Sequence, residues 1–324
     1  MTQHTLISAI TLALHDAMSQ DERIIIMGQD IGINGGVFRA TDTLWQTYGS
    51  QRVVDMPLAE NLMAEMPIGM AIEGLLPIME FQFSGFMYPA IESLINHATR
   101  MPKRTQSRFQ CPIVFRAPFG GGIRAPEHHS ETPESLMASI PQCDVVVPSC
   151  PNKAYHLLKH SITEPKPTVF LEPKRIYRSV KGPISNPNTC PPYQANLMTT
   201  GDQLTIISWG AMLYDCLTAI EQVPFNVELI DLTYLNPIDL PLCLHSAHKT
   251  GQVLIVQEGP LACSVASELS ANIHEHCHLS LKQPVKRMGA PNDIRPPYQY
   301  EKNHYMPSIQ KIIHTIHQMM GTQS

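Results

Sequence analysis

Short apolar runs alternate with amphipathic stretches along the first half of the chain. Residues 5–18 bring apolar side chains such as Leu6, Ile10 and Leu14 to one side of a helix, and residues 60–73 and 88–100 also have helical length. Between these stretches lie apolar runs of strand length, at residues 23–28, 52–55, 76–81, 111–116, 144–148 and 168–171. This alternation predicts an α/β fold in which helices cover both faces of a largely parallel sheet.

The pattern breaks in a segment rich in Pro, Asn and other polar residues, at 179–195. Such a segment buries little surface and is typical of a linker. A second series of strands follows, at residues 204–208, 227–231 and 253–257, with helices between them. We therefore predict an N-terminal domain of residues 1–185, a linker of residues 186–200 and a C-terminal α/β domain of residues 201–324.

Composition narrows the class of protein. The 324 residues suffice for two domains that each bury a core. Lys and Arg number 23 and Asp and Glu 28, and this net charge of −5 gives no electrostatic reason to expect binding to nucleic acid or to an anionic membrane. The sequence has neither a signal-peptide pattern nor a long apolar run, and its eight cysteines lack CxxC spacing. We expect a cytoplasmic protein with reduced cysteines, no membrane span and no metal site of its own.

Three places at predicted strand ends could carry chemistry. In the first, Glu60 enters the first turn of a helix, where the helix dipole alone favours an acid. The second is the aromatic segment 81–88, whose composition alone favours ordinary packing. In the third, three glycines at 120–122 allow backbone to approach a ligand, and Glu127, His128 and His129 suit acid–base chemistry better than metal binding.

The sequence also lacks the usual phosphate-binding motifs. It contains no GxGxxG, no GxxxxGK[ST], and no Gly-Asp-Gly followed by Asn that would hold a magnesium diphosphate. A chain that has acid–base groups but no cofactor cradle suggests a site completed by another subunit.

Several segments together resemble one family. They are GINGGVFRAT at 32–41, PLAE at 57–60, QFSGFMYP at 82–89, RAPFGGG at 116–122, EPKRIY at 172–177, VELIDL at 227–232 and NPID at 236–239. In this order they closely resemble the beta subunits of heterotetrameric 2-oxo acid dehydrogenases, over essentially the whole chain. The resemblance implies a two-domain transketolase-like fold. The beta subunit would bind the aminopyrimidine half of thiamine diphosphate, and an alpha subunit would hold the magnesium and the diphosphate.

The resemblance also implies roles for individual residues. Glu60 matches the glutamate that hydrogen-bonds the aminopyrimidine ring, and Phe86 matches the aromatic residue that stacks on it, with Phe83 and Tyr88 as close competitors. His129 matches the histidine at the reacting carbon. The implied neighbours of the cofactor are Met56 and Leu58, and the implied neighbours of the substrate or the proton path are His128 and Gln29.

The implied reaction is decarboxylation of a 2-oxo acid and transfer of its acyl group to the lipoyl arm of a dihydrolipoyl acyltransferase core. The implied assembly is an α2β2 tetramer, and the beta subunit is implied to be active only together with the alpha subunit. The segment 123–130 (IRAPEHHS) is closer to the pyruvate-type subunits, so we favour pyruvate over branched-chain acids and acetoin. The alternative is a non-catalytic subunit of the same fold, which retention of Glu60, Phe86 and His129 argues against.

Two positions depart from the family pattern. Gln29 stands where the family usually has Glu, an acid assigned to a path between two active sites. Lys166 stands where relatives place an Asn near a structural potassium ion, close to Ser161 and Glu164. Our hypothesis is that the Lys166 ammonium replaces this cation. The alternative is a solvent-exposed loop lysine with potassium retained.

Overall fold

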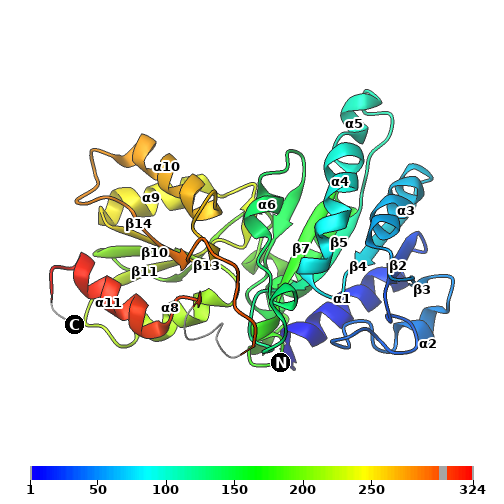
Figure 1. The fold of residues 1–324 in the computed structure, drawn as a ribbon, viewed down its shortest axis with the longest axis horizontal. Helices are drawn as coiled ribbons and strands as arrows, with labels where there is room; N and C mark the ends of the chain where they lie inside the picture. Colours follow the sequence, from blue (N-terminus) through cyan, green and yellow to red (C-terminus); the bar gives the residue numbers. More distant parts are fainter. Residues whose placement is uncertain (1, 299–304, 323–324) are drawn as a thin grey trace.

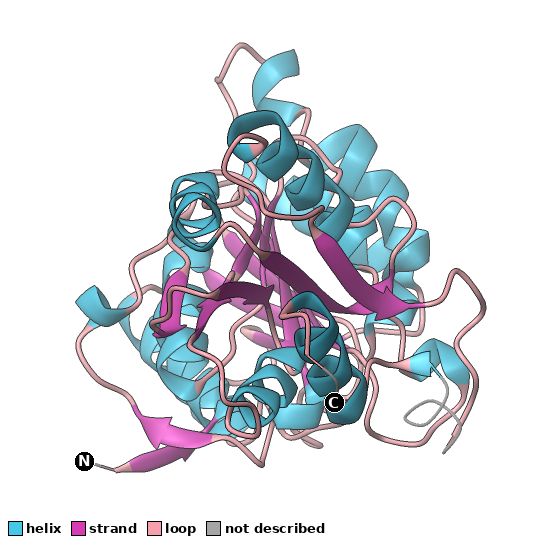
Figure 2. Ribbon diagram, turned by 90° about the vertical axis from the view of Figure 1, so that its left-hand side faces the viewer, coloured by secondary structure: helices cyan, strands magenta, loops and turns pink. Residues whose placement is uncertain are grey.

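The computed structural model describes residues 2–298 and 305–322. Two sheets, each between helices, form two neighbouring layered units (Figure 1). A small third sheet of two antiparallel strands lies near the N-terminus, apart from the others (Figure 2), and consists of β1 (Gln3–Thr5) and β8 (Lys181–Pro183). The predicted two-domain α/β architecture is therefore confirmed.

The N-terminal sheet has seven strands in the order β12-β6-β7-β5-β4-β2-β3. All neighbours are parallel except β12, which runs antiparallel to β6. The strands are β2 (Ile24–Gly28), β3 (Val53–Asp55), β4 (Leu76–Glu80), β5 (Val114–Phe119), β6 (Asp144–Val146), β7 (Thr168–Pro173) and β12 (Tyr234–Asn236). Most of these residues are buried, as expected for parallel strands that are covered on both faces.

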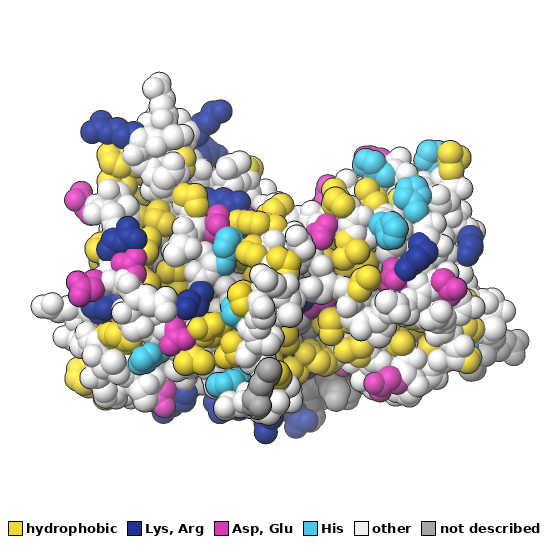
Figure 3. All heavy atoms as spheres, turned by 180° about the vertical axis from the view of Figure 1, so that it is seen from behind, with side chains coloured by type: hydrophobic (Ala, Val, Ile, Leu, Met, Phe, Trp, Pro, Cys, Tyr) yellow, Lys and Arg dark blue, Asp and Glu magenta, His cyan; other side chains and the backbone are white. Residues whose placement is uncertain are grey.

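Alternating strand residues face two different sets of helices. Ile24 and Ile26 pack with α1 (Leu6–Gln20) and α7 (Pro151–Thr163) on one face. Met27 and Met79 pack on the other face with α3 (Glu60–Ile72) and with the segment that follows β4. The shorter helices of this half are α2 (Leu44–Tyr48), α4 (Ile91–Ser93), α5 (Met101–Arg104) and α6 (Glu134–Ala138). α5 lies at the protruding end of the molecule, where Lys and Arg side chains gather (Figure 3).

Helix α1 begins at a capping box. The Thr5 hydroxyl accepts a hydrogen bond from the Ser8 amide at 3.2 Å, and the Ser8 hydroxyl accepts one from the Thr5 amide at 2.9 Å. The predicted helix of residues 88–100 was wrong as one continuous α-helix. The structure has a 3-10 helix (Ser84–Ala90), α4 and a π-helix (Leu94–Ala98) in succession. Pro89 lacks an amide hydrogen for the α-helical pattern, which accounts for the irregular start.

The C-terminal sheet has five strands in the order β14-β13-β10-β11-β9. Residues 196–199, inside the predicted linker, form its antiparallel edge strand β9. The strands are β9 (Asn196–Thr199), β10 (Leu204–Ser208), β11 (Val227–Asp231), β13 (Val253–Pro260) and β14 (Lys286–Ala290), and the helices are α8 (Met212–Ile220), α9 (Leu240–Thr250), α10 (Val265–Cys277) and α11 (Ile309–Met319).

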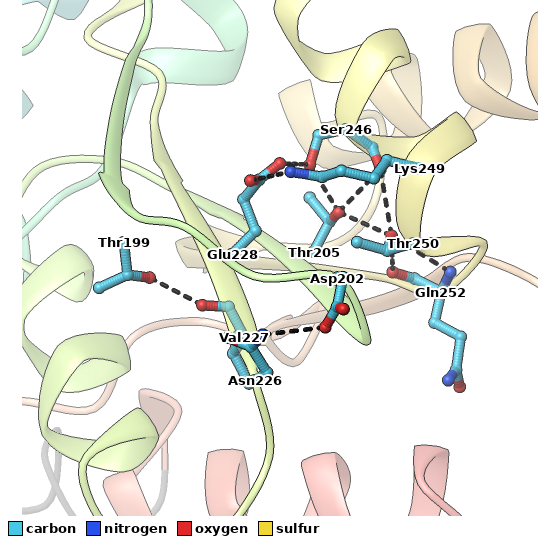
Figure 4. A network of polar contacts seen from close by, with 10 residues as sticks. All are labelled: Thr199, Asp202, Thr205, Asn226, Val227, Glu228, Ser246, Lys249, Thr250 and Gln252. Atoms are coloured by element: carbon cyan, nitrogen blue, oxygen red, sulfur yellow. Dashed lines mark hydrogen bonds and ion pairs between the residues drawn. The ribbon is translucent and has the colours of Figure 1, made fainter.

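A polar network fastens α9 to this sheet (Figure 4). The Glu228 carboxylate of β11 accepts hydrogen bonds from Ser246 and Lys249 of α9. Thr205 of β10 lies 2.7 Å from Ser246 and 2.8 Å from Thr250, hydroxyl to hydroxyl. Buried polar side chains stabilise a fold only when each has a partner. The buried members of this network, Thr205, Glu228, Ser246 and Thr250, each have at least two.

The two units share more than a chain connection. β12 follows the C-terminal strand β11 but completes the N-terminal sheet. Lys153 of α7 forms an ion pair with Asp231 at the end of β11, with 2.5 Å between Nζ and Oδ2, and donates to Thr233 at 2.7 Å. Both members of the ion pair are buried. The units therefore pack as neighbours with a polar contact inside their interface.

Candidate functional site

The candidate site lies where neighbouring strands of the N-terminal sheet end. β2 ends at Gly28, β3 at Asp55, β4 at Glu80 and β5 at Phe119, and each is followed by a loop that carries a predicted site residue. Strands β2, β3, β4 and β5 are parallel, so these ends share one edge of the sheet. Such an edge is the usual position of a ligand site in open α/β sheets.

Glu60 is the first residue of α3 and is partly exposed. The preceding Ala59 provides no side-chain cap for the helix. The Glu60 carboxylate is the acid in the first turn, where the helix dipole favours a negative charge. Gln29, which is 4% exposed, donates a hydrogen bond from Nε2 to Glu60 Oε1 at 3.2 Å. The same Nε2 lies 3.5 Å from the Met63 sulfur. The family departure at Gln29 therefore places a neutral amide on the predicted catalytic carboxylate.

The aromatic residues of the 3-10 helix meet the two histidines. The ring of Phe86 lies 5.6 Å from that of Phe83, 5.3 Å from His129 and 5.5 Å from His128, between ring centres. Phe83 is buried and packs edge-on against His129 at 4.7 Å. Tyr88 points its hydroxyl to the Glu131 carboxylate at 3.1 Å. Of the three aromatic candidates, Phe86 is the partly exposed one that contacts both histidines.

His128 and His129 belong to a short 3-10 helix (Glu127–His129). His128 is exposed, whereas His129 is partly buried and its Nδ1 has no hydrogen-bond partner among the described residues. Burial lowers the pKa of His129, and the nearby charges of His128 and Lys174 lower it further. A neutral imidazole can accept a proton, which suits the predicted acid–base role.

The glycines at 120–122 approach a side chain of the other domain. The Gly121 amide donates to Glu258 Oε1 at 2.6 Å, and Glu258 is the sixth residue of β13. Gly120 has a φ of +78°, and a Cβ atom there would lie 2.8 Å from the same oxygen. At Gly120 and Gly121 the close approach that glycine allows is made by the Glu258 carboxylate, and the approach of an external ligand to this loop stays a prediction.

Glu258 is a buried acid that remains ionised. Burial by itself would raise its pKa, but Arg295, Arg175 and the Gly121 amide outweigh burial, and the pKa lies below the ordinary value. Arg295 Nη1 lies 3.2 Å from Glu258 Oε1. The neighbouring Glu134 behaves in the opposite way, since burial raises its pKa to about 8. Near neutral pH, the buried region next to residues 120–131 thus holds a charged carboxyl group, that of Glu258, and a neutral one, that of Glu134.

A second buried network connects strands β4, β5 and β7. Arg116 of β5 is fully buried and contacts Glu80 of β4 at 2.8 Å and Glu172 of β7 at 2.7 Å, and Tyr177 donates to Glu172 at 2.5 Å. Gly36 packs directly above it, because a Cβ atom at Gly36 would lie 2.8 Å from Glu80 Oε1. This network supports the loop that follows Gln29.

The remaining predicted residues lie in different surroundings. Met56 is partly buried against the core, while Leu58 is 79% exposed. Lys166 lies at the far end of the sheet strands, beside the start of β7, with its ammonium 2.7 Å from Asp144 Oδ1 and 5.2 Å from the Tyr193 ring centre. Ser161 is buried in α7, and Glu164 pairs with His160 at 3.0 Å. The Lys166 ammonium therefore faces a carboxylate.

The sequence did not single out Lys174, Glu134, Glu258 or Arg295 as site residues. Lys174 follows β7 directly and donates to the backbone oxygens of Gly120 and His129. A polar residue at the end of a buried apolar strand was the available signal for both Lys174 and Glu258. Across residues 2–298 and 305–322, no group of three or more His, Cys, Asp or Glu side chains could hold a metal, and no helix is long and apolar enough to cross a membrane.

Known proteins resemble the chain over its whole length. Residues 3–180 match the family "Transketolase, pyrimidine binding domain" and residues 193–312 match "Transketolase, C-terminal domain". A split-gene transketolase, solved as an inactive beta4 tetramer, shares the fold with a TM-score of 0.79 at 19% identity, over 99% of both chains.

Curated relatives specify the family further. The "Pyruvate dehydrogenase E1 component subunit beta" of Acholeplasma laidlawii is 41% identical over 95% of both chains, and that of Bacillus subtilis is 36% identical over 99% of both. The "2-oxoisovalerate dehydrogenase subunit beta" of Bacillus subtilis is 37% identical over 92% of both. The chain therefore belongs to the family of E1 beta subunits of 2-oxo acid dehydrogenases, within the thiamine-dependent transketolase superfamily.

Proposed function

We propose that this chain is the beta subunit of a pyruvate-decarboxylating E1 component and supplies the aminopyrimidine half of its thiamine diphosphate site. The observation that carries the proposal is that Glu60, Phe86 and His129 lie in the segments that follow β3, β4 and β5 at one edge of the parallel sheet. The relatives named as pyruvate dehydrogenase subunits support pyruvate as the substrate. The relative named for 2-oxoisovalerate makes branched-chain acids the second candidate.

The side chains present fit the aminopyrimidine ring. Gln29 donates to Glu60 Oε1, and the carboxyl group keeps further sites that can hydrogen-bond a ring nitrogen. Phe86 offers a partly exposed aromatic surface, which orients a flat ring with little loss of side-chain entropy. When bound, thiamine diphosphate would supply a nucleophilic carbon that adds to the keto group and a ring that takes up the electron pair of the bond to the departing carbon dioxide. Magnesium and the diphosphate are assigned to an alpha subunit.

His129 is assigned to the substrate side of the site. Its lowered pKa keeps the imidazole neutral near pH 7, so that it can take a proton from, or return one to, the reacting group. His128 is exposed beside it and is assigned to the entrance. The acyl group is then proposed to leave to the lipoyl arm of a dihydrolipoyl acyltransferase core.

The loops around Glu60 carry the proposed contact surface for the alpha subunit. Four large apolar side chains there are more than 40% exposed: Ile33, Val37, Leu58 and Leu62. The Gly32 amide donates to Asp55 at 2.7 Å, which joins the loop of Ile33 to the segment of Leu58. Exposed apolar residues that surround half of a site favour a protein partner, and an α2β2 tetramer is the proposed assembly.

The assembly should be tested by co-expressing the chain with an alpha subunit that carries the magnesium–diphosphate motif. Thiamine-dependent decarboxylation of pyruvate and of 3-methyl-2-oxobutanoate is then measured with an artificial electron acceptor. We expect faster turnover of pyruvate, and no turnover by the chain alone. Glu60→Ala should abolish turnover in an intact tetramer, whereas Glu65→Ala, which alters an exposed acid of the same helix, should not.

Either substrate outcome is informative. Faster turnover of the branched-chain acid would overturn the pyruvate assignment and keep the family. A well-formed tetramer that decarboxylates neither acid would refute the catalytic proposal and leave a structural subunit.

Lys166 lies where relatives place an Asn near a structural potassium ion. Because the Lys166 ammonium already neutralises Asp144, we propose that it takes over the charge of a monovalent cation in this part of the fold. The Tyr193 hydroxyl donates a hydrogen bond to Asp144 at 3.0 Å, and the Tyr193 ring lies beside the Lys166 ammonium.

A further inference from the structure

Lys174 contacts the backbone of the loop that carries His129, residues 120–131. It follows β7 and begins a short 3-10 helix (Lys174–Ile176). Its side chain is 6% exposed, and its ammonium donates hydrogen bonds to the backbone oxygens of Gly120 and of His129, the latter at 2.8 Å. Removing an ammonium group from water costs several kcal/mol unless hydrogen bonds and charges compensate. This lysine therefore occupies a position that the fold must stabilise.

The two carbonyls belong to opposite ends of one loop. Residues 120–131 leave β5 and return to their starting point, because the Gly120 amide donates to the Glu131 oxygen at 3.0 Å. Lys174 adds a second connection at the same place, between Gly120 and His129. A single side chain thus fixes where the histidine stands relative to the end of β5.

Lys174 also contacts the ring against which His129 packs. Its Nζ lies 5.6 Å from the centre of the Phe83 ring, which in turn lies 4.7 Å from the His129 ring. The backbone and the imidazole of His129 are therefore both held through Lys174, directly in one case and through Phe83 in the other.

We propose that Lys174 is a positioning residue for His129, which holds the loop of His129 against the end of β5. This inference rests on the function proposed above. Lys174 acts through His129 without touching substrate.

The charges around His129 agree with this role. Burial lowers the pKa of His129 first, then the charges of His128 and Lys174, while Glu127 acts in the opposite direction. His128 and Glu127 lie on the same 3-10 helix, and Lys174 lies on the helix after β7. The helix of Phe83 and Phe86 presents uncharged rings to His129. Lys174 is thus the buried cation in this set.

The test compares Lys174→Met, Lys174→Arg and Lys153→Met in the assembled complex with the alpha subunit. Diethyl pyrocarbonate modification of His129, located by peptide mass spectrometry across a pH series, reports when the imidazole loses its proton. Turnover of the 2-oxo acid reports positioning. Lys153→Met is the matched control, because Lys153 is also a buried lysine of this domain but pairs with Asp231.

Lys174→Met should move the midpoint of His129 modification to higher pH and lower kcat by about 10- to 100-fold with little change in KM. Lys174→Arg keeps the charge but changes the geometry, so its midpoint should stay near that of the wild type while kcat falls. Lys153→Met should leave the midpoint unchanged, whatever its effect on stability.

Wild-type midpoint and kcat in Lys174→Met would overturn the proposal, as would an equal shift of the midpoint in Lys153→Met. If Lys174→Met does not fold, an Arg variant with wild-type kcat would overturn it instead. The modification assay needs no turnover, so it separates a failure of this inference from a failure of the proposed function.

Discussion

Glu134→Gln tests the account of the carboxyl groups behind the histidine loop. Glu134 begins α6 and is completely buried. Burial raises its pKa to about 8, from an ordinary value of 4.5, and the Glu258 carboxylate nearby adds to this effect. Gln keeps the shape of the side chain and removes its proton equilibrium.

The sign of the pH effect follows from proton counting. Between pH 4.5 and about 8, folded Glu134 retains a proton that the unfolded chain has lost, so the free energy of unfolding decreases as pH rises through this window. The pKa difference is about 3.5, and each unit of pKa corresponds to about 1.4 kcal/mol. Above pH 8 the free energy of unfolding is therefore lower by about 5 kcal/mol, as an order of magnitude. The Gln variant carries no such loss.

The assay is urea denaturation of wild type and variant at several pH values from 5 to 9. The fluorescence of Trp45 and Trp209 reports unfolding, because the two residues pack in different hydrophobic clusters. We expect the stability difference to shift in favour of Glu134→Gln by several kcal/mol between pH 5 and pH 9. Parallel stability curves for the two proteins would refute the reasoning, because other acids contribute equally to both.

Three further changes test other parts of the account. Gln29→Glu restores the family's usual acid about 3.2 Å from Glu60, where two unit charges repel by about 5 kcal/mol at an effective dielectric constant of about 20, so the two carboxyl groups should share a proton and the pH–rate profile should differ from that of the wild type while turnover is kept; an unchanged profile would contradict the Gln29 contact. Leu58→Asp should weaken association with the alpha subunit, measured by analytical ultracentrifugation, and undiminished tetramer would argue against the proposed surface. Lys166→Asn should make thermal stability depend on potassium, whereas equal melting temperatures in potassium and sodium salts would remove the replacement hypothesis.

The hydrophobic pattern predicted the strands well for a physical reason. Parallel strands such as 24–28 and 76–80 are buried on both faces, so they appear as continuous apolar runs. The pattern failed where backbone geometry or tertiary pairing decides the structure. Pro89 interrupts the helix after β4, and residues 196–199 become a strand only because they pair with β11.

The site divides in the same way. Glu60 and His129 were predicted as site residues because the segments that contain them resemble the motifs of one family, and their roles stay predictions. The groups that surround them come from distant parts of the chain: Lys174 is 45 residues from His129, and Glu258 is 137 residues from Gly121. No local pattern records such contacts, since the folded sheets create them.

Calorimetric titration with thiamine diphosphate and magnesium tests the central claim most directly, namely that this chain provides half of a site. The titration is performed on the chain alone, on the assembled complex, and on a complex with Glu60→Ala. We predict no measurable binding by the chain alone, saturable binding by the complex, and weaker binding by an equally well-assembled Glu60→Ala complex. Tight binding by the chain alone, or unchanged binding by the Glu60→Ala complex, would contradict it.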